Sequence, residues 1–423
     1  MTAARHSAPL RPDGTVLVIG GSLAGLRAAE TLRAEGFSGR LVMVGEELHL
    51  PYDRPPLSKQ VLAGTWPPER AMLVDRFKLD DLRLEQRFGQ RAVSLDAAGR
   101  TVTLGDGSTL TGDGIVIATG AQARTLPGVE GNQAVWVLRT LDDATQLRDR
   151  LVTLGPGARV VVVGAGFIGS EVASTCSTLG CDVTVLEALE VPLAPSLGHE
   201  IGGACAQLHR SHGVSLRTGV GVVAVHPPAP GVAGAGGPAG TVELNDGSMV
   251  TADVVVVGIG VRPTTGWLDG SGLSLDNGVV CDTALFAGAG IVAAGDVARW
   301  QWSHHGVEES VRIEHWQVAA EQAVAAARSL IAGSADAQPF DPVPYFWSDQ
   351  YGLRLQVLGR PLPTDEVAVV EGTLKDEKFV ALYGRAGRLS AALAISRPRQ
   401  LMGYRPLLEA GATWDEALAH AAG

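Results

Sequence analysis

Cysteine is scarce in this chain, with four in 423 residues. Small proteins that depend on disulfide cross-links are usually short and cysteine-rich, whereas a chain of this length buries most of its unfolded surface without them. Few cysteines suit a reducing compartment, so we expect a cytoplasmic protein. The length itself predicts two to four domains.

An excess of positive charge is also absent. The 34 lysines and arginines are outnumbered by 45 aspartates and glutamates, which gives a formal net charge of −11. Nucleic acids and anionic membrane surfaces attract basic proteins, so we expect neither as a partner. No apolar run approaches the length of a membrane span. Met1 to Gly14 has basic residues but no apolar stretch, so we expect a floppy tail rather than a secretory signal.

Metal-ligand patterns are missing as well. His304 and His305, together with His315, have no acidic or thiol partner at a ligand spacing. We therefore expect no metal site.

The most informative stretch runs from Val160 to Glu187. A short β-branched strand, Arg159–Val163, is followed at once by the turn Gly164-Ala165-Gly166-Phe167-Ile168-Gly169. A helix-period run reaches Leu179, and a second strand begins at Asp182. This order predicts a dinucleotide-binding unit, in which the glycines permit a tight turn, close approach of a pyrophosphate and close helix packing.

The second strand of this unit ends on Glu187. A carboxylate there accepts hydrogen bonds from the hydroxyl groups of an adenosine ribose and repels a 2'-phosphate. We therefore predict NAD rather than NADP.

A second unit of the same kind stands earlier in the chain. The strand Thr15–Ile19 leads into the turn Gly20 to Gly25, where Ser22 replaces the middle glycine. A helix from Leu23 to about Ala34 and a strand from Arg40 to Val44 follow. Two such units in one chain usually bind two dinucleotides, and the permanently bound one is normally FAD on the first unit.

Further segments suggest how the chain is divided. A similar strand follows each unit, Gly114–Gly120 after the first and Asp253–Gly260 after the second, which makes an internal repeat. Short β-rich runs between Tyr345 and Ile395 predict a small antiparallel sheet. The fold class predicted is α/β, with two Rossmann-like dinucleotide-binding domains of the glutathione-reductase type and a small C-terminal α+β domain. The predicted boundaries are 1–124 with 252–333 for the FAD domain, 125–251 for an inserted NAD domain and 334–423 for the C-terminal domain.

Taken together, Gly20 to Gly25, Pro51 to Lys59, Gly164 to Glu171, Gly295-Asp296 and Glu314-His315-Trp316 resemble the oxygenase-coupled NADH-dependent ferredoxin reductases. Tyr345 to Gln350 resembles the start of that family's third domain. The resemblance covers nearly the whole chain.

The resemblance implies site residues of three kinds. FAD contacts would come from Gly20, Ser22, Leu23, Ala24, Glu46, Arg54, Lys59, Val93, Arg139, Asp296, Glu314, His315 and Trp316. NAD contacts would come from Gly164, Gly166, Phe167, Ile168, Glu171, Glu187 and Gly260. Lys59 and Glu171 would form an ion pair where flavin and nicotinamide meet, and Trp347 would lie beside the flavin; we expect these three to be the catalytic residues.

The resemblance also implies an activity: NADH reduces FAD, which passes electrons to a [2Fe-2S] ferredoxin serving a haem-thiolate or Rieske oxygenase. The alternatives are an NADH:rubredoxin reductase, an NADH:oxygen reductase and a flavoprotein sensor like apoptosis-inducing factor. A monomer or weak dimer is expected. Arginines of the third domain would form a basic docking patch for the ferredoxin: Arg354, Arg360, Arg385, Arg388, Arg397, Arg399 and Arg405.

Cys176 and Cys181 have the C-x4-C spacing of flavin disulfide reductases. In those enzymes the pair follows the first nucleotide unit, whereas here it ends the helix of the second. We interpret both as small buried thiols with a structural role.

Overall fold

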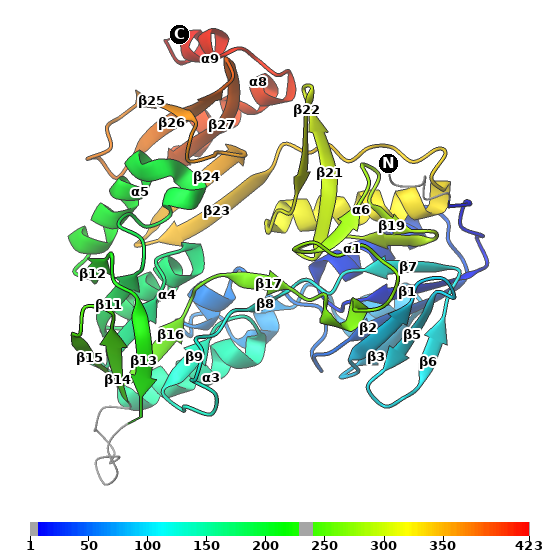
Figure 1. Cartoon of the computed structure of the whole chain (residues 1–423), viewed down its shortest axis with the longest axis horizontal. Helices are drawn as coiled ribbons and strands as arrows, with labels where there is room; N and C mark the ends of the chain where they lie inside the picture. The colour runs from blue at the N-terminus through cyan, green and yellow to red at the C-terminus, as the bar shows by residue number, and fades with distance from the viewer. Residues whose placement is uncertain (1–6, 228–239, 423) are drawn as a thin grey trace. The chain divides into compact units, whose positions relative to one another are not determined.

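The computed structural model describes residues 7–227 and 240–422. The chain forms two compact units, the first of residues 1–53, 72–122 and 262–342, and the second of residues 54–71, 123–261 and 343–423 (Figure 1). The stretch between His226 and Gly240 is rich in glycine, proline and alanine, which predicts a flexible loop, and it falls mostly outside the described residues. Within them, no helix is long and apolar enough to cross a membrane.

The first unit is built on a six-stranded sheet in the order β19-β20-β7-β1-β2-β3. β1 (Thr15–Ile19) pairs in parallel with β2 (Arg40–Gly45) and β7 (Gly114–Ile117), so its apolar side chains are buried on both faces. α1 (Leu23–Ala34) packs against α6 (Trp316–Ala332). β1, β2 and α1 lie within about one residue of their predicted ends, whereas β7 ends at Ile117, three residues before the predicted Gly120.

The remaining elements of the first unit extend or flank this sheet. Strands β3 (Leu84–Phe88), β19 (Phe286–Gly288) and β20 (Ile291–Ala293) complete it. Two three-stranded sheets comprise β4 (Ala92–Asp96), β5 (Thr101–Leu104), β6 (Thr109–Thr111), and β18 (Val279–Cys281), β21 (Ala298–His304), β22 (Val307–Val311). Short helices are α2 (Arg76–Asp81) and η3 (Gly266–Leu268).

Residues 7–14 contradict the expectation of a floppy tail. The Ser7 backbone nitrogen donates to Ser334 Oγ over 2.9 Å, and Ser7 Oγ accepts from the backbone of Gly290 over 2.9 Å. Ser7 is buried, and the Leu10 amide donates to the last carbonyls of α6. The segment therefore belongs to the fold, because it satisfies orphan carbonyls at a helix end.

The second unit contains a parallel sheet in the order β12-β11-β10-β16-β9. β10 (Arg159–Val163) lies between β11 (Asp182–Glu187) and β16 (Val254–Val257). The predicted boundary at residue 252 assigned β16 to the first domain, whereas its pairing with β10 joins it to this sheet. The local sequence does not show which sheet such a strand joins, since both units contain a similar short β-branched strand after the nucleotide-binding turn, β7 and β16.

The other described elements of this part of the second unit are three helices and five strands. They are β9 (Val135–Val137), α3 (Leu141–Leu154), α4 (Phe167–Thr178), α5 (Ala194–Ser211), β12 (Ser215–Thr218), β13 (Val222–His226), β14 (Gly240–Leu244) and β15 (Met249–Ala252). The chain passes from one unit to the other within β8 (Ala121–Ala123) and β17 (Val261–Pro263).

The C-terminal part of the second unit is an antiparallel sheet in the order β23-β24-β27-β26-β25, as the short β-rich runs predicted. Its strands are β23 (Tyr345–Gln350), β24 (Leu353–Gly359), β25 (Glu366–Glu371), β26 (Phe379–Arg385) and β27 (Arg388–Ile395). Helices α7 (Pro398–Gly403), α8 (Arg405–Glu409) and α9 (Trp414–Ala422) follow.

One apolar cluster joins this sheet to the nucleotide-binding part. Leu197 and Ile201 of α5 are fully buried among Leu355, Phe379 and Leu393 of the sheet. Burying such side chains supplies roughly 1.5–3 kcal/mol each. The C-terminal domain and the predicted NAD domain therefore share an apolar cluster within the second unit.

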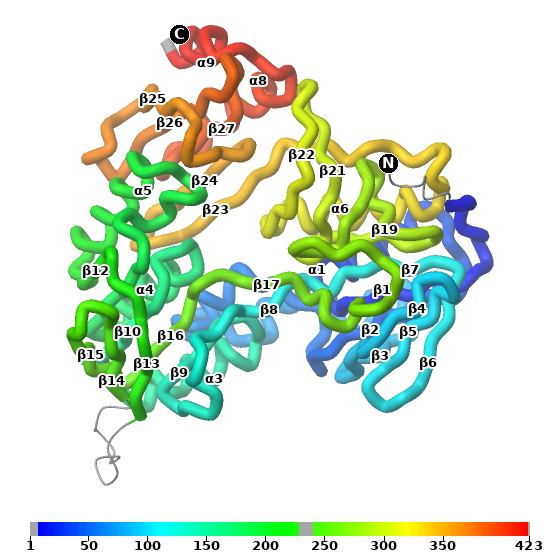
Figure 2. The backbone as a smooth tube through the Cα atoms, viewed as in Figure 1, coloured from blue at the N-terminus to red at the C-terminus, as the bar shows by residue number. Residues whose placement is uncertain are grey.

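Residues 54–71 also belong to the second unit. The π-type turn η1 (Leu57–Val61) packs against α3 and α4, while η2 (Pro68–Ala71) ends the segment. Figure 2 shows this blue segment beside α3. Leu62 is buried with Leu147 and Leu151 of α3, so the proline-rich loop is anchored by apolar contacts.

Candidate active site

The turn after β1 in the first unit leaves a helix N-terminus open to an anion. Gly20 has φ +130°, and a Cβ on it would lie 2.0 Å from the carbonyl oxygen of Ala118. A Cβ on Gly25 would lie 1.9 Å from the Gly20 carbonyl oxygen. Ser22 caps α1 with extended backbone and no side-chain hydrogen bond, so the amides of the first turn, including those of Leu23 and Ala24, are not used by a cap. This arrangement suits a pyrophosphate.

Other predicted FAD residues of the first unit lie at the ends of neighbouring strands and helices. Glu46 follows β2, is exposed and lies 3.6 Å from Arg91. Asp296 follows β20, where the carbonyl of Asp296 accepts from Arg312 over 3.0 Å. The preceding Gly295 has φ +77° and donates its amide to Gln322 of α6 over 2.8 Å. Val93 is half-exposed on β4, in a separate sheet.

The start of α6 gathers three more of the predicted residues. Glu314 pairs with Arg312 over 2.6 Å, and the indole nitrogen of Trp316 donates to Asp53 over 2.5 Å. His315 is the N-cap of α6, and burial lowers its pKa to about 4. Its imidazole is therefore neutral at physiological pH, so it adds no positive charge to this helix end.

The second unit repeats the glycine turn after β10. A Cβ on Gly164 would lie 2.5 Å from the Gly258 carbonyl oxygen, and one on Gly169 would lie 2.0 Å from the Gly164 carbonyl oxygen. The middle glycine differs, because a Cβ on Gly166 would approach no atom closer than 4.0 Å. Gly166 caps α4 without a side chain, so the glycine keeps the helix N-terminus accessible rather than relieving a clash inside the protein.

Glu187 lies beside this turn, as its position at the strand end predicted. One carboxylate oxygen accepts from the Ala165 amide over 2.7 Å, and the other from the Leu189 amide over 2.9 Å. A carboxylate has about four acceptor positions, so two remain for ribose hydroxyls. Ile168 and Ile259 are exposed and add apolar surface near the turn. Gly260, which has φ +90°, directly follows Ile259.

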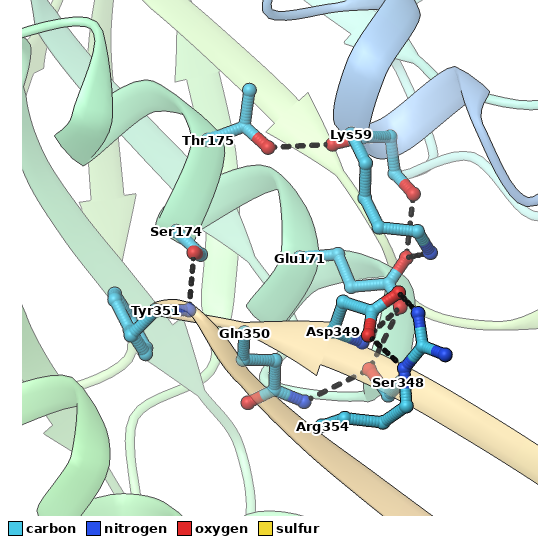
Figure 3. A network of polar contacts seen from close by, with 10 residues as sticks. Lys59, Glu171, Ser174, Thr175, Ser348, Asp349, Gln350, Tyr351 and Arg354 are labelled. Atoms are coloured by element: carbon cyan, nitrogen blue, oxygen red, sulfur yellow. Dashed lines mark hydrogen bonds and ion pairs between the residues drawn. The ribbon is translucent and has the colours of Figure 1, made fainter.

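Lys59 and Glu171 meet in the second unit. Nζ of Lys59 lies 2.8 Å from Oε2 of Glu171, and both side chains are largely buried, with 12% and 4% exposed (Figure 3). Ser58 Oγ also donates to Oε2 over 2.5 Å. On the other oxygen, Oε1 accepts from Ser348 Oγ over 2.8 Å and from the Asp349 amide over 3.2 Å. Four donors thus compensate the buried carboxylate.

These donors come from two separate segments, η1 and β23, whereas the carboxylate they surround belongs to α4 (Figure 3). Thr175 Oγ1 donates to the Ser58 carbonyl over 2.7 Å, and the Tyr351 amide donates to Ser174 Oγ over 2.7 Å. Sequence reasoning missed Ser58 and Ser348. Both stand inside the motifs that carried the resemblance, but nothing in their local sequence shows that they face a carboxylate.

Arg54, Arg139, Phe167 and Trp347 complete the predicted set. Arg54 donates to the backbone carbonyl of Arg139, so the Arg54 guanidinium lies against the backbone of that residue. The Phe167 ring packs edge-on against Phe346 of β23, with centroids 4.8 Å apart. Trp347 stacks with Tyr345, and strand alternation directs it to the face opposite Ser348 and Glu171.

The arginines proposed as a docking patch are mostly paired with acids of their own domain. Arg385 pairs with the buried Asp365 over 2.7 Å. Arg354 and Arg397 pair with Asp349 and Glu371 over 2.6 and 2.7 Å respectively. Such pairing neutralises much of the positive field, so the sequence count of arginines overstates the basicity of this surface.

Two mainly parallel sheets, each with a glycine turn after an inner strand that suits a pyrophosphate, define an oxidoreductase that uses two dinucleotides. Residues 14–323 match the profile of the pyridine nucleotide-disulphide oxidoreductases, and residues 345–422 match the reductase C-terminal profile. The chain belongs to the pyridine nucleotide-disulphide oxidoreductase family. Members of this family use FAD and NAD(H).

Relatives match along nearly their whole length. The chain is 38% identical to the ferredoxin–NAD(+) reductase component of the anthranilate 1,2-dioxygenase system of Burkholderia cepacia, covering 94% of this chain and 95% of that one. It is 36% identical to rhodocoxin reductase of Rhodococcus erythropolis, covering 93% and 89%. The crystal structure of the covalent putidaredoxin reductase–putidaredoxin complex matches with a TM-score of 0.87 at 29% identity, covering 97% and 98%.

Proposed function

We propose that this chain is an FAD-containing NADH:ferredoxin oxidoreductase that delivers electrons to a [2Fe-2S] ferredoxin of a haem-thiolate or Rieske oxygenase. The observation that carries the proposal is the buried pair between Lys59 of η1 and Glu171 of α4, the helix that follows the NAD-type glycine turn. The relatives named as ferredoxin reductases of oxygenase systems support the acceptor. Free thiols at Cys176, Cys181 and Cys205 are in keeping with the cytoplasm, where we place the enzyme.

FAD, when bound, accepts a hydride from NADH and returns the electrons one at a time. The first glycine turn and the amides of Leu23 and Ala24 would hold its pyrophosphate. Gly166 and the N-terminus of α4 would hold the pyrophosphate of NADH, while Glu187 would accept from its ribose hydroxyls.

Lys59 and Glu171 have the positioning role. The three uncharged donors hold the Glu171 carboxylate in one orientation. The carboxylate in turn fixes the position of the Lys59 ammonium group. A fixed cation stabilises negative charge that develops nearby, with no reorganisation at the moment of transfer.

The experiment that tests the proposal is an absorption spectrum of the purified protein, recorded before and after NADH is added without oxygen. The expected result is a flavin spectrum that bleaches with NADH and recovers when an oxidised [2Fe-2S] ferredoxin is added. A protein that stays colourless after incubation with FAD contradicts the proposal.

The acceptor separates the alternatives. If the enzyme reduces rubredoxin or oxygen faster than any [2Fe-2S] ferredoxin, it is a rubredoxin or oxygen reductase. Slow reduction with a long-lived charge-transfer band would instead make it a sensor. That alternative has one observation in its favour: 34% identity to human apoptosis-inducing factor 3, over 92% of this chain and 62% of that protein.

A further inference from the structure

The C-terminus of α4 brings two cysteines together. α4 is followed by Leu179 and then by Gly180, whose φ is +81°. The Cys181 amide donates to the Cys176 carbonyl over 3.0 Å, and the Gly180 amide donates to the Ser177 carbonyl over 3.0 Å. These are the two hydrogen bonds of a Schellman motif, in which the side chains at the positions of Cys176 and Cys181 are commonly in contact.

The two thiols have different surroundings. Cys176 is fully buried among Val172 and Val183, whereas Cys181 is half-buried at the edge of the same cluster. The interaction between the two thiols, together with burial, holds the pKa of Cys176 well above its usual range, while the same interaction lowers the pKa of Cys181. Cys181, the less buried of the two cysteines, is therefore the more readily ionised.

This differs from the surroundings of a cysteine with a purely structural role. Cys205 of α5 is fully buried, and burial raises its pKa to about 12. The expectation that Cys176 and Cys181 are both small buried thiols with a structural role therefore fits Cys176 better than it fits Cys181.

We propose that Cys176 and Cys181 form a reversible disulfide, which makes the end of α4 a thiol-oxidation site independent of the flavin. The motif supports this because its six-residue ring holds the two Cα atoms at a separation that a disulfide spans. The oxidant is a hydroperoxide such as hydrogen peroxide.

The steps are balanced in atoms and electrons. The Cys181 thiolate attacks the peroxide, so that an S–O bond forms, the O–O bond breaks and one water leaves after protonation. Cys176 then attacks the sulfenic sulfur of Cys181, an S–S bond forms, the S–O bond breaks and the Cys176 proton leaves with the hydroxide as a second water. The two cysteines lose two electrons, and the peroxide gains them.

The two cysteines lie between two elements that carry predicted NAD contacts. α4 begins at Gly166 and carries Glu171, and β11 begins directly after Cys181 and ends at Glu187. A disulfide would therefore link the end of one element to the start of the other. Because it restricts the unfolded chain, the oxidised form should unfold at a higher temperature than the reduced form.

The test uses the FAD-loaded protein, treated with a small excess of hydrogen peroxide, then alkylated after denaturation and cleaved after glutamate. The peptide from Val172 to Glu187 contains Cys176 and Cys181 and no other cysteine. We expect this peptide to escape alkylation and to lose the mass of two hydrogen atoms, and dithiothreitol to reverse both effects. Oxidised glutathione in place of peroxide should give the same peptide.

Variants identify the partners. Cys181→Ser should abolish the cross-linked peptide and the rise in Tm, while Cys205→Ala, the matched control, should keep both. The proposal is overturned if both cysteines of the wild-type peptide stay open to alkylation, if Cys181 is oxidised to a sulfinic acid while Cys176 still alkylates, or if a disulfide persists in Cys181→Ser. The wild-type peptide decides the question even if a variant does not fold.

Discussion

Oε2 of Glu171 lies 2.8 Å from the ammonium nitrogen of Lys59, and the two residues are 112 positions apart in the chain. The pair is nearly excluded from water, so its charges interact more strongly than those of the surface pairs elsewhere in the molecule. Removing either partner leaves the other buried and unpaired, which makes this pair the most sensitive point of the site.

Lys59→Met should slow reduction of the flavin by NADH or weaken FAD binding, because the fixed cation is lost while the volume is kept. It should also lower the free energy of unfolding by roughly 3–5 kcal/mol, since the carboxylate of Glu171 keeps only its uncharged donors. Stopped-flow bleaching and FAD content measure the first effect, and denaturant unfolding measures the second.

Lys78→Met is the control for this experiment, because Lys78 is exposed and its partner Glu30, 2.5 Å away, keeps a second cation in Arg27. Its removal should change stability by no more than about 1 kcal/mol. Wild-type bleaching and full FAD content in Lys59→Met would contradict the role of the pair.

Changing Glu187 to Arg should reduce the preference for NADH over NADPH by at least on the order of tenfold, because a cation at the strand end attracts the 2'-phosphate. The ratio of kcat/KM for the two nucleotides measures this. Glu190→Arg, at an exposed position three residues on, is the matched control. An unchanged ratio in the Glu187 variant would mean that this carboxylate does not read the ribose.

Gly166→Ala and Gly169→Ala should separate binding from folding. Alanine at 166 meets no protein atom within 4.0 Å, so the fold should keep its Tm while the affinity for NADH falls by about tenfold or more. Alanine at 169 meets the Gly164 carbonyl at 2.0 Å, so the packing of α4 on β10 should fail. Thermal unfolding and NADH titration test the pair of variants; equal Tm values for both would refute the distinction.

His209 should make the protein less stable in acid. Burial lowers its pKa to about 4, from about 6.5 in the unfolded chain, and its ring is held between Ser170 and Tyr351 at 3.2 and 2.6 Å. Between those two pH values the unfolded state binds more protons, so the free energy of unfolding falls as the pH drops from about 6.5 to about 4. The contribution is at most roughly 3 kcal/mol.

His209→Gln should flatten this dependence, and His199→Gln, at an exposed position, should not. Denaturant unfolding at several pH values provides the comparison. The buried His315 contributes in the same range, so part of the slope should remain in His209→Gln. A slope identical to the wild type would show that His209 is protonated in the folded protein.

Most of the fold could be predicted because its signals are local. The strand Thr15–Ile19, the helix Leu23–Ala34 and the strand Asp182–Glu187 each have an uninterrupted apolar pattern bounded by glycine or charge. The grouping of the parts could not be predicted, because it depends on which apolar faces meet. Leu62 packs on α3 and Leu197 on the C-terminal sheet, so the loop 54–71 and the third domain join the second unit.

The amino-acid sequence alone determined the two glycine turns, the acid at the end of β11 and the NAD-type and FAD-type units, since each depends on residues within about thirty positions of one another. Only the tertiary structure decided the surroundings of Glu171, whose hydroxyl donors Ser58 and Ser348 lie 113 and 177 positions away. A buried carboxylate must be compensated by donors from whichever segments pack around it, and that choice is made by three-dimensional packing rather than by spacing in the chain.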